Sequence, residues 1–206
     1  MSVVTLFVEG DPDYRSDAQQ MRDTLNSILG EDAVAELRLL QRYDVEGVSQ
    51  SEWTPELVSI FADPVTDIHH SDAPTSGGIE WIGVEYLPGQ FDQRSDSAQQ
   101  CLQVVLKRRL RVRNVRIFGV GFASAVADRL PTLRSAVESF LVNPVDSRRC
   151  EPFQPFRFDE HHHDPPMVAP VPNLLDDAGK VEALRQELAL AMSLEDLALL
   201  RTYFLE

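Results

Sequence analysis

The chain has 206 residues, of which 43% are apolar and 25% charged, an ordinary globular composition that excludes collagen-like, coiled-coil and wholly disordered chains. Its 33 acidic and 19 basic residues give a formal net charge of −14, which argues against binding to nucleic acid or to an anionic membrane surface. The amino terminus has no secretory pattern, and no apolar run approaches the roughly 18 residues of a membrane span. We therefore expect a cytoplasmic protein in which Cys101 and Cys150 are reduced.

The first part of the chain predicts a strand, a helix, a strand, a helix and a last short strand. Residues 3–9 are rich in β-branched and aromatic residues and precede a turn at residues 10–13. A helix then follows from a Ser16 cap to a stop at Gly30. Its apolar residues at helical spacing are Met21, Leu25, Ile28 and Leu29. A strand over 37–43, a helix over about 54–61 and a strand over 64–68 complete the series.

The next part of the chain predicts the same series again. A strand over 79–86 and a turn over 87–90 precede a helix capped by Asp92 or Ser95. The apolar face of this helix is expected to consist of Cys101, Leu102, Val105 and Leu106. A strand over 112–120, a helix over 131–141 and a strand over 144–147 follow. Pro131 suits the first turn of its helix, where the missing N–H costs nothing.

Short matches between the two parts indicate an internal duplication. Val8-Glu9 resembles Val84-Glu85, and two further matches share an offset of 80 residues. These are Gln19-Gln20 with Gln99-Gln100, and Pro64-Val65 with Pro144-Val145. We interpret residues 1–78 and 79–150 as two copies of one module, each a small open sheet with helices on one face. The prediction is an α+β pseudo-dimer whose copies bury their exposed sheet faces against each other, as a symmetric homodimer would.

The basic run from Lys107 to Arg113 allows two interpretations. It would suit a patch that binds phosphate or nucleic acid, but it also suits the carboxyl end of a helix, where the macrodipole favours cations. We favour the helix end, because the rest of the chain would repel a polyanion.

The composition changes after residue 150. Residues 151–173 hold six of the 13 prolines and predict an extended connector. Residues 174–206 predict a helical segment. Its first helix, over 180–190, places Val181, Leu184 and Leu188 on one face. Its second helix is capped by Ser193 and carries a stripe of Leu194, Leu197, Leu200 and Phe204. We expect this stripe to dock on the pseudo-dimer or on something beyond Glu206.

The ligand-rich clusters do not predict a site. His161-His162-His163 is the densest, but a proline-rich connector offers few partners to orient metal ligands. His69-His70 with Asp72 begins a polar loop and is expected to be solvated. Gly119-Val120-Gly121 lacks the third glycine of a dinucleotide fingerprint, and there is no nucleophile elbow. We therefore predict no catalytic, cofactor-binding or metal-binding residue in this chain.

Five segments resemble one family. Residues 41–47, Gln-Arg-Tyr-Asp-Val-Glu-Gly, and the longer block from Val84 to Cys101 are the most specific. Segments 63–67, 143–148 and 191–197 follow the order found in the same proteins. Together they resemble the start of large-type phosphoribosylformylglycinamidine synthases, the glutamine-dependent ligases of purine biosynthesis.

The resemblance implies an architecture and a reaction. Such enzymes begin with a domain similar to a fused dimer of the small PurS-type subunit, followed by a helical linker, a synthetase and a glutaminase. They use ATP and glutamine to amidate formylglycinamide ribonucleotide. The segments that bind ATP and Mg²⁺, and the glutaminase nucleophile, would follow Tyr203-Phe204, so the family places no catalytic residue here.

Three functions are consistent with these observations. We favour a non-catalytic scaffold that holds the synthetase and glutaminase in register for ammonia transfer, through its outer helices and the 194–204 stripe. Alternatively, the chain is a fragment of one long polypeptide whose ligase activity it cannot perform. The third alternative is a stand-alone homo-oligomeric binding module with no enzymatic role.

Overall fold

The structure is a computed structural model that describes residues 2–158, 182–183, 185 and 190–205. The chain divides into two compact units, Met1–Phe158 and Asp159–Glu206. The strands of the first unit are β1 (Val3–Gly10), β2 (Val34–Glu46), β3 (Asp67–His70), β4 (Glu80–Tyr86), β5 (Arg111–Phe122) and β6 (Ser147–Cys150). Its helices are α1 (Ser16–Leu29), α2 (Pro55–Val58), α3 (Gln93–Leu106) and α4 (Leu130–Leu141), with 3-10 turns η1 (Pro12–Tyr14) and η2 (Ser124–Arg129). The second unit contains α6 (Leu194–Leu205).

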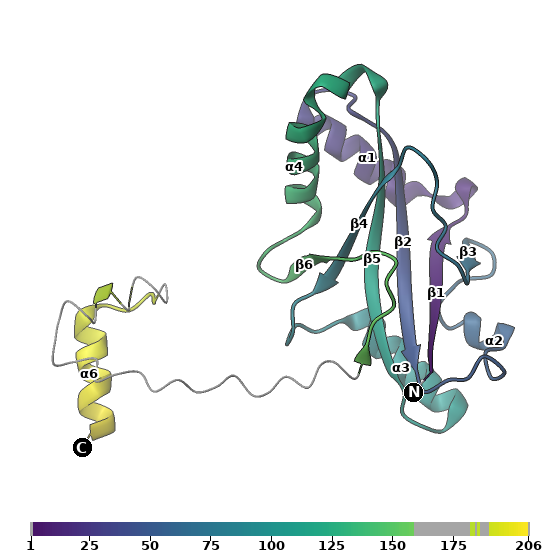
Figure 1. The fold of residues 1–206 in the computed structure, drawn as a ribbon. Coiled ribbons are helices and arrows are strands. Elements are labelled where there is room, and N and C mark those ends of the chain that lie inside the picture. The colour runs from purple at the N-terminus through teal and green to yellow at the C-terminus, as the bar shows by residue number, and fades with distance from the viewer. Residues whose placement is uncertain (1, 159–181, 184, 186–189, 206) are drawn as a thin grey trace. The chain divides into compact units, whose positions relative to one another are not determined.

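The six strands form one antiparallel sheet in the order β3-β1-β2-β5-β4-β6 (Figure 1). The predicted α+β class is therefore confirmed. The order is symmetric about its centre. From one edge inwards, residues 3–70 supply β3, β1 and β2, and from the other edge inwards, residues 80–150 supply β6, β4 and β5. The predicted burial of two sheet faces against each other is wrong. The two halves join edge to edge, where β2 and β5 pair from Glu36↔Gly121 to Glu46↔Arg111, so that each satisfies the other's backbone groups.

Helices α1 and α3 are built alike. Each has 14 residues and ends before a residue in the left-handed conformation, Gly30 at φ 72° and Lys107 at φ 56°. Each also buries a leucine at its tenth position, Leu25 or Leu102. These features match at an offset of 77 residues, so Gln19-Gln20 and Gln99-Gln100 do not occupy equivalent positions.

The caps and apolar faces of these helices correct the prediction. Ser16 is the first residue of α1 rather than its cap, whereas Asp92 caps α3 through its carboxylate. Ile28 on α1 is 62% exposed and Val105 on α3 is 56% exposed. Cys101 is also exposed. The buried stripes follow i, i+4 spacing, with Met21, Leu25 and Leu29 on α1 and Ala98, Leu102 and Leu106 on α3. Ile28 and Val105, three positions after Leu25 and Leu102, lie outside these stripes and face solvent.

The other predicted elements of the first unit exist with shifted bounds. Helix α2 is a single turn, and β3 and β6 begin at residues 67 and 147, later than expected. The prolines before them lie in turns held by side chains. The Asp63 carboxylate accepts from the backbone N–H of Val65 at 2.8 Å, and the Asn143 side chain accepts from that of Val145 at 3.2 Å. These turns take up the residues that were predicted as strand, because proline has no N–H to donate to a ladder.

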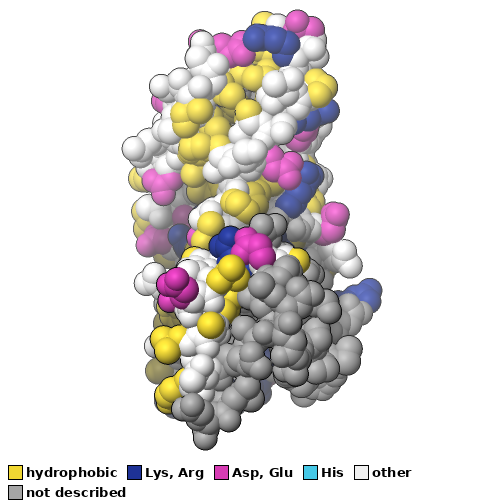
Figure 2. Space-filling view, turned by 90° about the vertical axis from the view of Figure 1, so that its left-hand side faces the viewer, with side chains coloured by type: hydrophobic (Ala, Val, Ile, Leu, Met, Phe, Trp, Pro, Cys, Tyr) yellow, Lys and Arg dark blue, Asp and Glu magenta, His cyan; other side chains and the backbone are white. Residues whose placement is uncertain are grey.

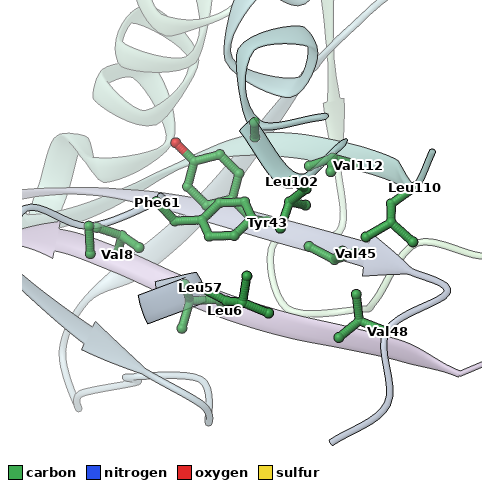
Figure 3. Packing of buried hydrophobic residues seen from close by; sticks show 12 residues of the cluster. Leu6, Val8, Tyr43, Val45, Val48, Leu57, Phe61, Leu102, Leu110 and Val112 are labelled. Atoms are coloured by element: carbon green, nitrogen blue, oxygen red, sulfur yellow. The ribbon is translucent and has the colours of Figure 1, made fainter. Parts of the chain in front are cut away.

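The core between the sheet and its helices has two main clusters. Figure 3 shows the first, where Tyr43 on β2 packs against Phe61 and α3 contributes Leu102. The second joins Leu25 of α1 and Val137 of α4 to Phe118 and Val120 of β5. Helices α1, α3 and α4 therefore all cover the same sheet face. Figure 2 views the flank that carries α4, where apolar side chains lie among acidic and basic ones.

Helix α6 starts as predicted. The Ser193 hydroxyl accepts from the backbone N–H of Asp196 at 3.1 Å, and the Asp196 carboxylate accepts from the Ser193 N–H at 2.8 Å. This reciprocal pair resembles a capping box. Hydrogen bonds from the Ser193 hydroxyl and the Ser193 backbone N–H lower the pKa of Asp196. The apolar face predicted for helix 180–190 lies outside the described residues. Of the helices that the structure describes, none has the length and apolar character to cross a bilayer.

Candidate functional site on the helix-free face of the sheet

The sheet face opposite α1, α3 and α4, here called the helix-free face, combines an apolar patch with buried charges. Its patch contains Phe7, Leu40, Val115 and Ile117. Since side chains alternate along a strand, the residues two positions from these share the face. By this alternation, all buried charged residues of the described chain lie on the helix-free face. They are Glu9, Arg42, Asp44, Glu46 and Glu85. Charges are rarely buried unless they are paired, so we take this face as the candidate site.

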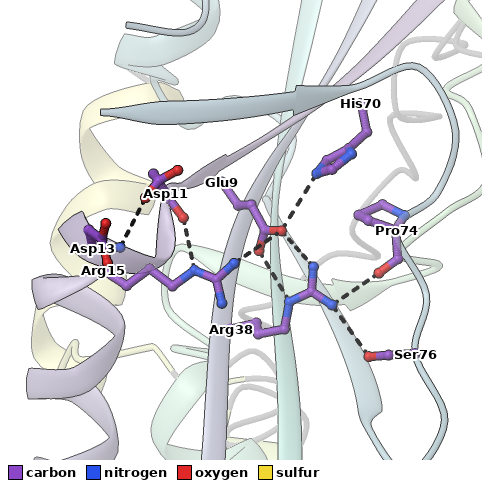
Figure 4. Close-up of polar contacts among 9 residues, drawn as sticks. Glu9, Asp11, Asp13, Arg15, Arg38, His70, Pro74 and Ser76 are labelled. Atoms are coloured by element: carbon purple, nitrogen blue, oxygen red, sulfur yellow. Dashed lines mark hydrogen bonds and ion pairs between the residues drawn. The ribbon is translucent and has the colours of Figure 1, made fainter. Parts of the chain in front are cut away.

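Glu9 lies near the end of β1, and its carboxylate lies close to the side chains of two arginines and one histidine (Figure 4). Arg38 of β2 binds both carboxylate oxygens, at 2.6 and 3.1 Å. Arg15 lies 3.5 Å from the same carboxylate and His70 Nε2 lies 3.6 Å from it. His69 and His70 belong to β3 rather than to the predicted loop, and His69 is exposed as expected, whereas His70 is half-buried.

Arg38 also fastens the connection between the two halves. Its Nη1 donates to the carbonyl of Pro74 at 3.1 Å and to the Ser76 hydroxyl at 3.3 Å. Pro74 and Ser76 lie between β3 and β4, in the segment that leads from one half to the other. The Glu9–Arg38 pair thus fixes that crossing to the sheet.

Glu85 occupies the corresponding place in the second half. Like Glu9, it is the residue before the last in the first strand of its half. Arg148 of β6 lies 2.7 Å from its carboxylate and Arg113 of β5 lies 3.7 Å from it. The sequence match between Val8-Glu9 and Val84-Glu85 therefore marks similar positions in the structure.

Arg42 and Asp44 form the centre of the face. Arg42 Nε donates to Asp44 Oδ2 at 3.0 Å, and the Thr5 hydroxyl donates to Oδ1 at 2.7 Å. Both side chains are almost completely buried. What covers them is the segment of residues 151–158, here called the strap, which follows β6 and crosses the sheet (Figure 1).

The strap is held by its backbone. Arg42 Nη1 donates to the carbonyls of Glu151 at 2.9 Å and Pro152 at 2.7 Å. The backbone N–H of Phe156 donates to Asp44 Oδ2 at 3.1 Å. The first eight residues of the predicted connector are therefore part of the first unit. Residues 159–173 lie outside the described residues.

Three phenylalanines of the strap cover other residues of the face. The Phe153 ring lies 5.9 Å from that of Phe7 and 5.3 Å from that of Trp81, measured between ring centroids. The Arg113 guanidinium lies 4.9 Å from the centre of the Phe156 ring, and Arg111 lies 5.1 Å from that of Phe158. Such cation–π contacts are worth about 0.5–2 kcal/mol, depending on burial.

Cys150 lies at the start of the strap. It packs with Phe153 at the edge of the apolar patch, and its backbone pairs with Gly83 of β4. Burial, with a smaller effect of the nearby Glu85 carboxylate, raises the pKa of the Cys150 thiol to about 11. A thiol with such a pKa is a poor nucleophile at neutral pH, so Cys150 has a packing role.

Only the start of the basic run lies at the end of a helix, as was favoured for it, because Arg111 and Arg113 belong to β5. Lys107 is the residue that ends α3, and Arg108 pairs with Glu52 at 2.7 Å. Arg111 pairs with Glu46, and Arg113 lies beside Glu85. Hydrogen bonds from Ser49 and Arg108 lower the pKa of Glu52. Arg108, Arg111 and Arg113 thus each pair with a specific carboxylate.

The interface residues predicted on α6 remain a prediction. Leu194 and Leu200 are 44% and 40% exposed, and Leu197 is partly buried. Phe204 belongs to α6, but its side chain lies outside the described residues. The cluster His161–His163 also lies outside them. Within the part of the chain that the structure describes, no group of three His, Cys, Asp or Glu side chains could hold a metal ion.

The strap was not predicted from the sequence. Its signal was the spacing Phe153-x-x-Phe156-x-Phe158 beside prolines, which composition alone assigned to a connector. A scan against protein-family models finds no match to this chain, and a search of curated proteins finds none either.

Proposed function

We propose that this chain is the amino-terminal, non-catalytic part of a large-type phosphoribosylformylglycinamidine synthase. In this role it is a scaffold that holds the synthetase and glutaminase in register, so that ammonia passes between them. The observation that carries the proposal is the strand order β3-β1-β2-β5-β4-β6, in which two halves of similar build share one sheet. Two fused copies of one module would have this arrangement, and we propose that the halves arose by duplication.

The segments that resemble the synthases have structural roles, which supports a non-catalytic part. Arg42, Asp44 and Glu46 supply buried charges of the helix-free face, while Tyr43 and Val45 enter the core on the other side. Gly47 has φ 90°, and a Cβ there would lie 3.0 Å from Leu110. The block from Val84 to Cys101 contains the end of β4, the turn and most of α3. Packing accounts for the first segment and for Val84, whereas Phe91 and Cys101 of the second are exposed.

Reconstitution tests the proposal. This chain is added to a synthetase–glutaminase polypeptide that lacks its own amino-terminal region, and amidation of formylglycinamide ribonucleotide is followed with glutamine and, separately, with ammonia. A scaffold restores the glutamine-dependent reaction and has a smaller effect on the ammonia-dependent one, since external ammonia needs no transfer. The matched control carries Leu197→Asp and Phe204→Asp, which should prevent docking while circular dichroism shows the sheet unit folded.

The other outcomes are also informative. If only covalent fusion restores activity, the chain works as a fragment of a longer polypeptide. If fusion fails as well, although both parts are folded, the family proposal is wrong. A defined homo-oligomer in sedimentation, without any restoration, would favour the stand-alone binding module. If the double variant restores activity as well as the wild type, α6 is not the docking surface.

A further inference from the structure

We propose that the helix-free face is a peptide-recognition site, and that residues 151–158 are its resident ligand. The ligand class is a peptide segment with phenylalanines in the spacing Phe-x-x-Phe-x-Phe. This inference does not depend on the proposed function, because it follows from the contacts between the strap and the sheet.

The polar contacts recognise the ligand's backbone. Arg42 binds two successive carbonyls, and Asp44 binds one N–H four residues after the second of these. A donor and an acceptor at fixed places on a sheet define the direction and register of the bound segment, as in other peptide-binding domains. Because the three contacts involve only main-chain groups, they would accept the same segment whether or not it is joined to β6.

The aromatic contacts supply the specificity. Phe153 fits against Phe7 and Trp81, while Phe156 and Phe158 stack on Arg113 and Arg111. Both arginines belong to β5 and are held by carboxylates of neighbouring strands, Arg113 by Glu85 and Arg111 by Glu46. The three aromatic subsites are thus formed by side chains fixed within the sheet, and such preorganisation favours binding.

The strap is the last segment of its unit, so releasing it would break no connection between the strands of the sheet. The first unit ends at Phe158, and the strap joins the sheet covalently only through β6. A tethered ligand has an effective concentration of about millimolar for its site. The resident strap therefore excludes a free peptide of the same sequence, and the site becomes available only when the strap is weakened.

The test uses the full chain with Phe153→Ala, Phe156→Ala and Phe158→Ala, and a fluorescein-labelled peptide of residues 151–158. We expect the labelled peptide to bind this triple variant, measured by anisotropy, and to bind the wild type at least tenfold more weakly. A peptide with Phe156 replaced by alanine should lose roughly tenfold in affinity, and a scrambled peptide should not bind. Equal binding of the scrambled peptide, or no binding to a triple variant that is folded by circular dichroism, would overturn the proposal.

A second measurement uses the wild-type chain and so does not depend on the variant folding. Amide hydrogen exchange should show the Phe156 N–H exchanging faster than the amides of β2 and β5, because the strap opens while the sheet stays intact. If the Phe156 N–H exchanges only at the rate of global unfolding, the strap is not separable and the recognition site is refuted.

Discussion

Arg42 and Asp44 lie two residues apart on β2 and pair at 3.0 Å, with only 3% and 0% of their side chains exposed. The Asp44 carboxylate accepts three hydrogen bonds, from Arg42, Thr5 and the backbone of Phe156. Asp44→Asn replaces one acceptor oxygen by a donor and leaves the Arg42 charge buried without a counter-charge. We expect it to lower the free energy of unfolding by about 3–5 kcal/mol.

The measurement for this change is the urea midpoint of the sheet unit. Glu52→Gln is the matched control, because it removes a carboxylate from an exposed pair with Arg108. Exposed pairs contribute at most about 1 kcal/mol, so the control should stay close to wild type. Equal midpoints for the two variants would contradict the role assigned to Asp44.

Leu102→Ala and Val105→Ala compare the two sides of α3. Leu102 is completely buried, and its truncation should cost about 2–5 kcal/mol of unfolding free energy through lost burial and a cavity. Val105 is more than half exposed, so Val105→Ala should change the free energy by no more than about 0.5 kcal/mol. Thermal or urea unfolding of the two variants checks the buried stripe. A large loss for Val105→Ala would mean that this side of the helix is covered.

Gly83→Ala should loosen the strap and destabilise the sheet unit. A Cβ at Gly83 would lie 2.7 Å from the Cys150 carbonyl oxygen and 2.9 Å from Pro152 Cα, so backbone must move. We expect a loss of about 1–3 kcal/mol. Iodoacetamide should also modify Cys150 faster than in wild type. Gly77→Ala is the control, since a Cβ there has no neighbour within 4 Å. The prediction fails if both variants keep wild-type stability and Cys150 reactivity.

The raised pKa of the Cys150 thiol predicts that the folded chain loses stability at alkaline pH. Its pKa is raised from 9.0 to about 11 in the folded chain, so the folded state keeps the proton that the unfolded state releases. The contribution to stability is complete below about pH 9 and is lost as the pH rises through 11. We expect wild type to lose more stability than Cys150→Ser between pH 8.5 and pH 11, as measured by urea midpoints. Parallel curves for the two proteins would show that the thiol does not contribute.

Much of the fold of the first unit followed from local patterns. Strands around Val3–Gly10 and Arg111–Phe122 were predicted from β-branched and aromatic runs, and Gly30 correctly marked the end of α1. The repeat was predicted from short matches, but only some of these mark similar positions in the structure. Val8-Glu9 and Pro64-Val65 have structural counterparts, whereas the glutamine pairs lie one helical turn apart when α1 and α3 are aligned at their ends.

The arrangement of the halves and the candidate site were not predictable in the same way. Two such modules can pack face to face or pair through their edge strands. The alternation of apolar and polar residues along β2 is compatible with both arrangements. The strap was missed because its prolines indicate an extended backbone but do not indicate which surface that backbone covers. Arg42 and Asp44 became informative only once the topology placed them beneath residues more than 100 positions later.

The pairing of β2 with β5 also has a consequence for how the chain folds. Leu40 lies opposite Ile117, 77 positions along the sequence, and the whole central ladder joins residues at comparable separations. Contacts between distant residues close large loops, and chains rich in them reach the native state slowly. The antiparallel pairs β1–β2 and β4–β5 lie within one half each and close shorter loops, so they can form before the middle of the sheet does. The seam between the halves is therefore the step that should limit the rate of refolding.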